Sequence, residues 1–280
     1  MKFKAWEARK HIEASYKSAL RELGNFLSDK ILEDDTFDKV FKKLTHAQQS
    51  KPFNQWVQSL AKTFITNTLE ENARTWRQAA RKSSQGDMIR NSLENLMEDT
   101  HTGTRVKELV ADNAKYIKTI PKDVTQDMTK YMQEQAFKGR RTAYRDADFK
   151  KMVGNMTEKH AKVIARTETS KAMSALTQAR SEDIGLDWYI WHTSEDVRVR
   201  NSHKNMDNVL CRFSDPPAPE ELVGEKSAGH YQAGNIYNCR CYSAPVVLWK
   251  NVSWPHRVYA DGKISSMTKQ QFKKTFGIEV

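Results

Sequence analysis

The sequence predicts an α+β protein, with a mainly helical N-terminal region and a C-terminal module of one long helix plus short antiparallel strands and loops. Apolar residues recur at helical spacing over roughly the first 150 residues, whereas an aromatic, β-branched run and many turn residues follow Gly185. Because 38% of residues are hydrophobic and 29% are charged, helices with broad solvated faces are favoured over a thick buried sheet. A chain of 280 residues is long enough for two folding units, and we expect segments at 1–150, 151–250 and 251–280.

The N-terminal region is predicted to form a series of helices. The first carries one long apolar stripe, and Pro52 is typical of the start of the second. A third helical stretch is interrupted at Gly103, the next ends at Pro121, and a further helix follows. The stripe residues, helix by helix, are Trp6, Ile12, Tyr16, Leu20, Leu23, Leu27 and Ile31; Phe53, Trp56, Val57, Leu60, Phe64 and Trp76; Met88, Leu93, Leu96 and Met97; Val106, Leu109, Val110, Ala114 and Ile117; Val124, Met128, Tyr131 and Met132.

A basic segment ends this region, from Lys138 to Lys151. It holds six basic residues against two acidic ones, in a chain whose net charge is +11 and whose pI is about 9.4. Such cations are suited to sequence-independent contact with DNA phosphates. A solvated linker between domains is the alternative, and a basic balance also aids solubility. The basic residues are Lys138, Arg140, Arg141, Arg145, Lys150 and Lys151.

One long helix is predicted from Thr157 to Ile184. Alanines at helical spacing form its buried side, and Gly185 ends it. Arg166 and Glu168 stand two positions apart, so they project to different faces and cannot pair within the helix. Ion pairs with surface neighbours are one interpretation of these two charges.

The aromatic run at 187–193 predicts a strand that is covered on both faces. After a turn, Val197 and Val199 alternate with Arg198 and Arg200, which predicts either a second short strand or an extended arm. The two guanidinium groups could grip a phosphate or carboxylate, or fold onto a nearby aspartate as a structural network. The candidate aspartates are Asp196, Asp207 and Asp215. We expect the Pro-rich loop at 214–219 to be exposed polyproline II.

The cysteines suggest a metal site. Three cysteines cannot all pair, and Cys239 lies too close to Cys241 in sequence for a comfortable disulfide, so reduced thiols or metal ligands are expected. With His203 they offer three ligands for a structural zinc, and Cys211 is the preferred fourth. The other candidates for the fourth ligand are His192, Asp207 and His230. Simple packing of the cysteines as small apolar side chains is the alternative.

The order of these pieces resembles the phage head morphogenesis family, the Mu F-like minor head proteins of tailed bacteriophages. The resemblance covers roughly residues 155–250. Where the family has Gly after the motif aspartate, this chain has Asn208, the non-Gly residue that best tolerates positive φ. The motif residues that carry the resemblance are Arg166, Thr167, Glu168, Asp196, Arg198, Arg200, His203, Asp207, Cys239, Arg240 and Cys241.

The resemblance implies a minor head protein that associates with the portal inside the prohead or virion. Such proteins assist head assembly and DNA packaging or ejection, so the implied partners are the portal protein, double-stranded viral DNA and a major capsid or scaffolding protein. It assigns 151–250 to the Mu F-like domain and gives the Arg166–Glu168 stretch the role of holding its helix against the β region. We expect segment 1–150 to dock on the portal or capsid, because its aromatic stripes exceed what a thin bundle can bury.

An enzyme is not expected, because nothing orients a base on a nucleophile and no Gly-rich phosphate loop is present. Two alternatives remain: a metal-dependent nuclease that uses His192, His203 and His230 near Asp207, and a DNA-binding adaptor unrelated to capsids. No apolar run reaches the ~18 residues of a membrane span, and the basic start lacks the apolar core of a signal peptide. We therefore expect a soluble protein, made in the host cytoplasm and then held in the virion.

Overall fold

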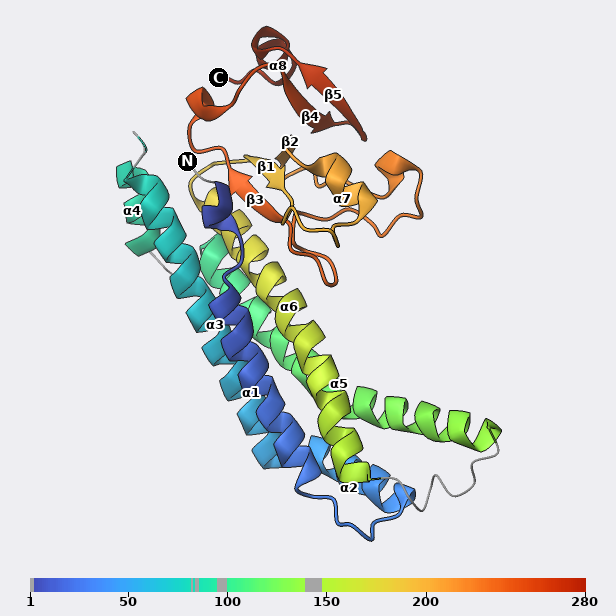
Figure 1. The fold of residues 1–280 in the computed structure, drawn as a ribbon. Helices are drawn as coiled ribbons and strands as arrows, with labels where there is room; N and C mark the ends of the chain where they lie inside the picture. Colours follow the sequence, from blue (N-terminus) through green and yellow to red (C-terminus); the bar gives the residue numbers. More distant parts are fainter. Residues whose placement is uncertain (1–2, 82, 84–85, 95–99, 139–147) are drawn as a thin grey trace. The chain divides into compact units, whose positions relative to one another are not determined.

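The computed structural model describes residues 3–81, 83, 86–94, 100–138 and 148–280 (Figure 1). The predicted α+β class is confirmed, with long helices in the first two thirds of the chain and a sheet near the C-terminus. The helices are α1 (Lys10–Ser28), α2 (Phe37–Gln49), α3 (Lys51–Ala80), α4 (Gly86–Glu94), α5 (His101–Phe137), α6 (Phe149–Asp183), α7 (Asn201–Met206) and α8 (Lys269–Phe276). The strands are β1 (Trp188–His192), β2 (Val209–Arg212), β3 (Tyr242–Pro245), β4 (His256–Ala260) and β5 (Lys263–Met267).

The chain forms two compact units. One, here called the mixed unit, comprises 1–9, 67–107 and 169–280; the other, the helical unit, comprises 10–66 and 108–168. Helices α3, α5 and α6 contribute residues to both. The predicted segments 1–150, 151–250 and 251–280 are each continuous in sequence, whereas each of the two units is built from separate parts of the chain. No helix of the described residues combines the length and apolarity needed to cross a membrane.

Most of the predicted stripe residues face the interior, although Met88 and Tyr131 are each 40% exposed. Tyr16 of α1 stacks on Phe64 with a centroid distance of 3.9 Å, and its hydroxyl donates to Asn113 Oδ1 at 2.9 Å. Tyr16 and Phe53 are only 3% and 2% exposed, and Trp6 of the mixed unit is 3% exposed against Trp76. The fold itself covers these three aromatic side chains, whereas Trp56 of the same stripes is only half-buried. The expectation that part of this apolar surface meets a partner stays a prediction.

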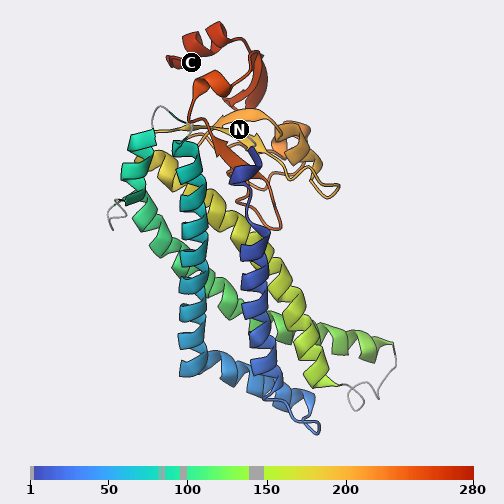
Figure 2. The ribbon, with the colours of Figure 1, turned by 60° about the vertical axis from the view of Figure 1, so that its left-hand side comes forward.

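The helix boundaries predicted at Gly103 and Pro121 are wrong, because α5 runs unbroken from His101 to Phe137. Gly103 does not interrupt it, since Gly103 lies in the first turn, where its N–H donates to the capping Thr100 hydroxyl at 2.9 Å. Pro121 lies inside the helix, and α5 changes direction along its length in both views (Figure 1 and Figure 2). A proline that lacks the backbone N–H and bends the helix accounts for this change.

Helix α6 begins at Phe149, eight residues before the predicted start at Thr157. The end is as predicted: α6 stops at Asp183, and Gly185 follows with φ +69°. Its alanines permit close packing, and Ala161, Ala165 and other small side chains on one face are buried. The predicted stripe residues Leu96 and Met97 lie outside the described residues.

The sheet has the strand order β3-β1-β2-β4-β5. Strand β1 pairs antiparallel with β2 and β3, and β2 pairs parallel with β4, so the sheet is mixed rather than wholly antiparallel. The predicted burial of β1 on both faces is confirmed. Tyr189 and Trp191 pack into one apolar cluster with the cysteines, while Trp188 and Ile190 pack into a second.

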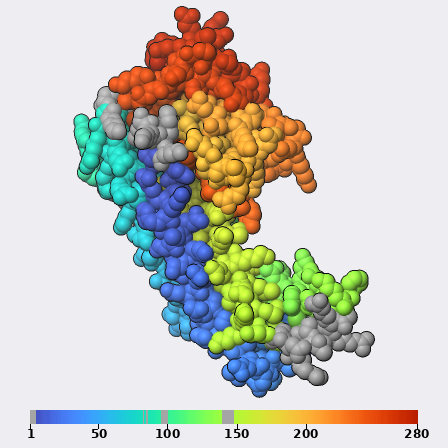
Figure 3. Space-filling model, in the orientation of Figure 1, coloured from blue at the N-terminus to red at the C-terminus, as the bar shows by residue number. Residues whose placement is uncertain are grey.

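Residues 251–280, expected as a separate segment, complete the sheet and one of its cores. Strands β4 and β5 extend the sheet, and α8 brings Phe272 against Trp188 at a centroid distance of 4.8 Å. Helix α8 begins with a capping box at Thr268 and ends at Gly277 in the left-handed region. The space-filling view shows the C-terminal residues (red) lying directly on the sheet region (gold and orange) (Figure 3).

Candidate functional site

Asp207 and Asn208 anchor the motif to the end of β1. The Asp207 carboxylate accepts hydrogen bonds from the Thr193 N–H at 2.7 Å and the Thr193 hydroxyl at 3.1 Å. Asn208 adopts φ +57°, and its N–H donates to the Trp191 carbonyl at 2.8 Å. The prediction that Asn can replace the family's Gly at this turn is therefore confirmed.

The stretch after β1 is a turn and not a second strand. The Arg198 N–H donates to Asp196 Oδ1 at 2.9 Å, and the Val199 N–H donates to the Asp196 carbonyl at 3.1 Å. The strand interpretation of 197–200 is therefore wrong. An Asp side chain that satisfies backbone N–H groups two residues on favours a turn over strand pairing.

The arginine network also differs from the one expected. Asp196 pairs with the guanidinium of Arg240, and Arg200 donates to the Tyr237 carbonyl at 2.9 Å. Burial raises the pKa of Asp196, but the Arg198 N–H and the Arg240 guanidinium outweigh it and lower the pKa overall. Arg198 is exposed, and among the described residues its guanidinium has no hydrogen-bond partner. Of the remaining expected aspartates, Asp215 pairs with Arg212 at 3.1 Å.

His203, Cys239 and Cys241 converge as the sequence predicted. The Sγ atoms of both cysteines lie 3.4 Å from the same atom, Nδ1 of His203. All three side chains are buried, and their ligand atoms lie within 4.8 Å of one another. The backbone N–H of Cys241 also donates to the Cys239 sulfur at 3.3 Å. The hydrogen bond from the Cys241 thiol lowers the pKa of Cys239 and outweighs the effect of its burial.

Two residues that the sequence did not point to hold the other side of the His203 ring. Nε2 of His203 lies 2.9 Å from the Tyr231 hydroxyl, which donates to Glu220 Oε1 at 2.6 Å. Ser202 also donates to Glu220 Oε1, at 3.4 Å. Burial, and then the bond to Glu220, raises the pKa of Tyr231, so this hydroxyl keeps its proton. In a single sequence an isolated Glu and Tyr carry no signal of this arrangement.

Cys211, the preferred fourth ligand, does not belong to this group. It lies on β2 opposite Tyr189, and its thiol faces the Val209 carbonyl at 3.7 Å. Of the other candidate ligands, His192 stacks on Tyr242 at 5.4 Å, and burial lowers its pKa. His230 is exposed and contacts the Pro216 carbonyl at 2.8 Å. The histidines of the nuclease alternative therefore do not form one cluster with His203 among the described residues.

The Pro-rich loop is another correction, because much of it is buried. Pro217 and Pro219 are buried, and Ala218 is 4% exposed. The Pro217 carbonyl accepts the Tyr231 N–H at 3.0 Å, so the loop packs against the segment that supplies Tyr231. The loop leads directly to Glu220, which accepts the hydrogen bond from Tyr231. It therefore helps to position His203 and is not an exposed linker.

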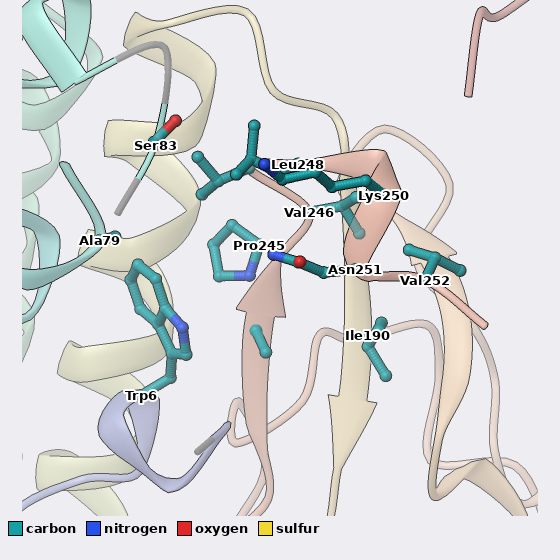
Figure 4. A pocket seen from close by; sticks show the side chains of 12 residues that line it. Trp6, Ala79, Ser83, Ile190, Pro245, Val246, Leu248, Lys250, Asn251 and Val252 are labelled. Atoms are coloured by element: carbon teal, nitrogen blue, oxygen red, sulfur yellow. The ribbon is translucent and has the colours of Figure 1, made fainter. Parts of the chain in front are cut away.

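A small pocket of about 80 Å³ borders the cluster. It is lined by Ser194, Arg198, Val199, Arg200, His203, Asn238, Cys239, Arg240 and Cys241. Beside it, Val197 is 95% and Tyr237 is 58% exposed. A larger pocket of about 320 Å³ lies elsewhere in the mixed unit, between Trp6 and the chain after β3; apolar side chains line most of it, with Lys250 at its edge (Figure 4).

The Arg-Thr-Glu residues of the motif belong to the helical unit. In the helical unit, Arg166 Nε lies 3.6 Å from Glu13 Oε1, while Thr167 and Glu168 are buried. Their expected role of holding the helix against the β region stays a prediction.

Part of the basic segment can be located in the structure. Lys138, Lys150 and Lys151 are exposed, and Lys150 Nζ lies 3.7 Å from Asp29 Oδ1. Arg140, Arg141 and Arg145 lie outside the described residues. DNA contact by this segment therefore stays a prediction.

Comparisons with known proteins agree with the motif. Residues 114–244 match the family model described as Phage Mu protein F like protein. A protein of Haemophilus influenzae, described as uncharacterized, is 34% identical over 143 residues, which is 51% of this chain and 30% of the relative. The chain therefore spans less than a third of that relative's length. No solved structure matches the chain.

Proposed function

Residues 114–244 belong to the phage Mu protein F-like family, and from this premise we propose that the protein is a minor head protein of a tailed bacteriophage. The family match supports a phage head-related protein that belongs to the virion. The finer proposal is that it associates with the portal inside the head, binds the viral DNA without sequence preference, and assists assembly and DNA packaging or ejection. Its role is structural and not catalytic.

The observation that carries this proposal is that the motif residues between Asp196 and Cys241 assemble around one point of the mixed unit. Asp196 and Arg240 pair, Asp207 ties the α7 end to β1, and His203 meets both motif cysteines. Residues that are distant in sequence thus form a single structure over the span of the family match. This arrangement supports the family's function in preference to a chance match of short motifs.

DNA binding is supported by charge. The chain has a net charge of +11, and contact with phosphates needs only exposed, flexible cations. Lys138 and Lys151 are exposed at the two ends of the basic segment. Binding to duplex DNA should therefore be independent of sequence and should weaken steeply as salt is raised.

The test compares two double variants with equal charge. Arg140→Glu with Arg141→Glu, and Lys39→Glu with Lys42→Glu on α2, each lower the net charge from +11 to +7. We expect only the first to weaken duplex binding strongly, and to reduce the slope of log affinity against log salt by about 2, since each phosphate contact contributes about 0.9. An equal loss of duplex affinity in both double variants would mean that only the overall charge matters. Unchanged affinity in both would contradict DNA contact by this segment.

Portal association is the second part of the proposal, and it rests on the family. The two units each present a large apolar side chain that the fold leaves open: Phe137, 94% exposed, in the helical unit, and Val197, 95% exposed, in the mixed unit. Exposed apolar side chains of this kind are candidates for burial against a partner. We assign the docking surface to the helical unit, as the sequence led us to expect for segment 1–150.

Co-expression with the portal protein of the same phage, followed by size-exclusion chromatography, tests this assignment. The full chain should elute with the portal, Phe137→Ser should reduce the bound fraction, and Val197→Ser should not. The reverse pattern would move the docking surface to the mixed unit. Absence of any complex with the wild type would contradict portal association.

A further inference from the structure

We propose that His203, Cys239 and Cys241 bind one zinc ion, and that Tyr231 and Glu220 hold the histidine as a ligand. Cys211 has no part in the site. The proposal goes beyond the head-protein function and does not depend on it. It rests on the geometry of the five side chains that meet behind the small pocket.

The first argument is the convergence of two sulfurs on one nitrogen. Nδ1 of His203 has one lone pair or one proton, so it can make one good hydrogen bond, yet both Sγ atoms lie 3.4 Å from it. A tetrahedral zinc with Zn–S of about 2.3 Å and Zn–N of about 2.0–2.1 Å sets each S–N separation at about 3.5–3.6 Å. The observed separations differ from that by only one or two tenths of an ångström, so both sulfurs stand at nearly the distance from Nδ1 that a shared zinc ion requires.

The second argument is the tautomer of His203. Tyr231 donates its hydroxyl proton to Glu220 Oε1 at 2.6 Å, so its oxygen must accept from Nε2 of His203 at 2.9 Å. His203 then carries its proton on Nε2, which leaves the Nδ1 lone pair directed toward the sulfurs. A histidine ligand whose second nitrogen donates to an oriented oxygen or carboxylate is the usual arrangement at zinc sites.

The third argument is charge. Both thiols release their protons to solvent when they bind zinc, and two thiolates with a neutral imidazole cancel the double charge of the ion. A buried centre that is neutral overall avoids the large cost of burying a net charge. The Cys241 N–H that donates to the Cys239 sulfur at 3.3 Å stabilises thiolate character there.

Three protein ligands leave the fourth position of a tetrahedral zinc open. The pocket of about 80 Å³ borders all three ligands, and Arg198, Arg200 and Arg240 line it. We assign the fourth position to a ligand that enters from this pocket, water in the resting state, which a small anion can replace because cations surround the entrance.

Zinc content and affinity of the full-length protein provide the main test. Protein purified without chelator should hold about one zinc per chain, and chelated wild type should take up one equivalent again. Cys239→Ser should lose zinc, whereas Cys211→Ser, a matched change of a buried cysteine in the same apolar cluster, should retain it. The zinc site would be refuted if the wild type bound no zinc, or if both variants lost zinc equally. The cysteines would then be explained as small apolar side chains that pack in the core.

Because Cys239→Ser could fail to fold, a gentler pair of variants tests the support of His203. Tyr231→Phe should weaken zinc binding about 10- to 100-fold, while Tyr237→Phe, at an exposed tyrosine near the same pocket, should not change it. Unchanged affinity in Tyr231→Phe would refute the role of the Glu220–Tyr231 pair.

The open fourth position has its own readout. Wild type loaded with Co²⁺ should show thiolate-to-metal charge transfer and the visible bands of a four-coordinate ion, and azide should shift those bands. Arg198→Ala should weaken the azide response without changing metal content. Bands that azide leaves unchanged would overturn the open position.

Discussion

Removal of the Phe272 side chain tests whether residues 251–280 belong to the fold. Phe272 is fully buried, and its ring lies 4.8 Å from Trp188, 5.2 Å from Trp249 and 5.0 Å from Trp254 between centroids. Truncation of a buried Phe to Ala costs about 3–5 kcal/mol, because apolar contact is lost and a cavity remains. Phe276 is a fourth aromatic partner, at 4.8 Å. Such pairs, each worth about 0.5–1.5 kcal/mol beyond buried area, place Phe272→Ala near the upper end of that range.

Urea unfolding followed by tryptophan fluorescence is the suitable assay, since three tryptophans surround the substituted ring. The free energy of unfolding is obtained by linear extrapolation, and the dependence on urea is compared between variants to detect separate unfolding of this region. A fluorescence change at low urea in Phe272→Ala, before the main transition, would mean that β4, β5 and α8 open first.

The matched control is Phe137→Ala, the same substitution at a side chain that is 94% exposed. Its effect should stay within about 0.5 kcal/mol, as for other surface changes. If Phe272→Ala lowered the free energy of unfolding by less than about 1 kcal/mol, or no more than Phe137→Ala, α8 would not be docked on the sheet as described.

The other predictions concern a turn and a histidine. Asn208 has φ +57° and an exposed side chain, so Asn208→Gly should leave stability within about 0.5 kcal/mol, while Asn208→Ala should cost about 1–2 kcal/mol of αL strain. Equal urea midpoints for the two variants would contradict this. Burial lowers the pKa of His256 from 6.5 in the folded protein. The unfolded chain therefore binds the proton more readily than the folded protein does. The stabilisation that is present above pH 6.5 is consequently lost as the pH falls through the folded pKa. Stability measured at pH 7.5 and 5.5 should therefore fall less in His256→Gln than in wild type, and equal falls would refute the assignment.

Local patterns predicted the elements whose formation depends on their own residues. The stripe of α1 is periodic and the run of β1 is aromatic, and Gly185 and Asn208 take the positive φ that their residue types allow. Gly103 and Pro121 failed as boundaries for a physical reason. A side-chain cap from Thr100 satisfies the first turn of α5, and packing along the helix outweighs the single hydrogen bond that Pro121 removes.

The parts that could not be predicted depend on contacts between distant residues. Whether Cys211 joins the other cysteines depends on the register of β2 against β1, which places it opposite Tyr189. The same holds for Glu220 and Tyr231, whose roles exist only because a buried loop brings both to His203. Periodicity carries no information on either arrangement, whereas the pairing of His203 with two nearby cysteines was accessible from residue chemistry alone.

The motif residues separate into those that the fold already uses and those that retain capacity for a ligand. Asp207 accepts two hydrogen bonds from Thr193, and Asp196 neutralises Arg240, so their carboxylates stabilise the turn that precedes α7. Nδ1 of His203 lies 3.4 Å from two sulfurs at once, although it can make only one good hydrogen bond. The first group thus stabilises the loops, and the second borders one pocket. This division supports the proposal that the motif binds a soft divalent cation, because two sulfurs and an imidazole nitrogen are the ligand atoms that such an ion prefers.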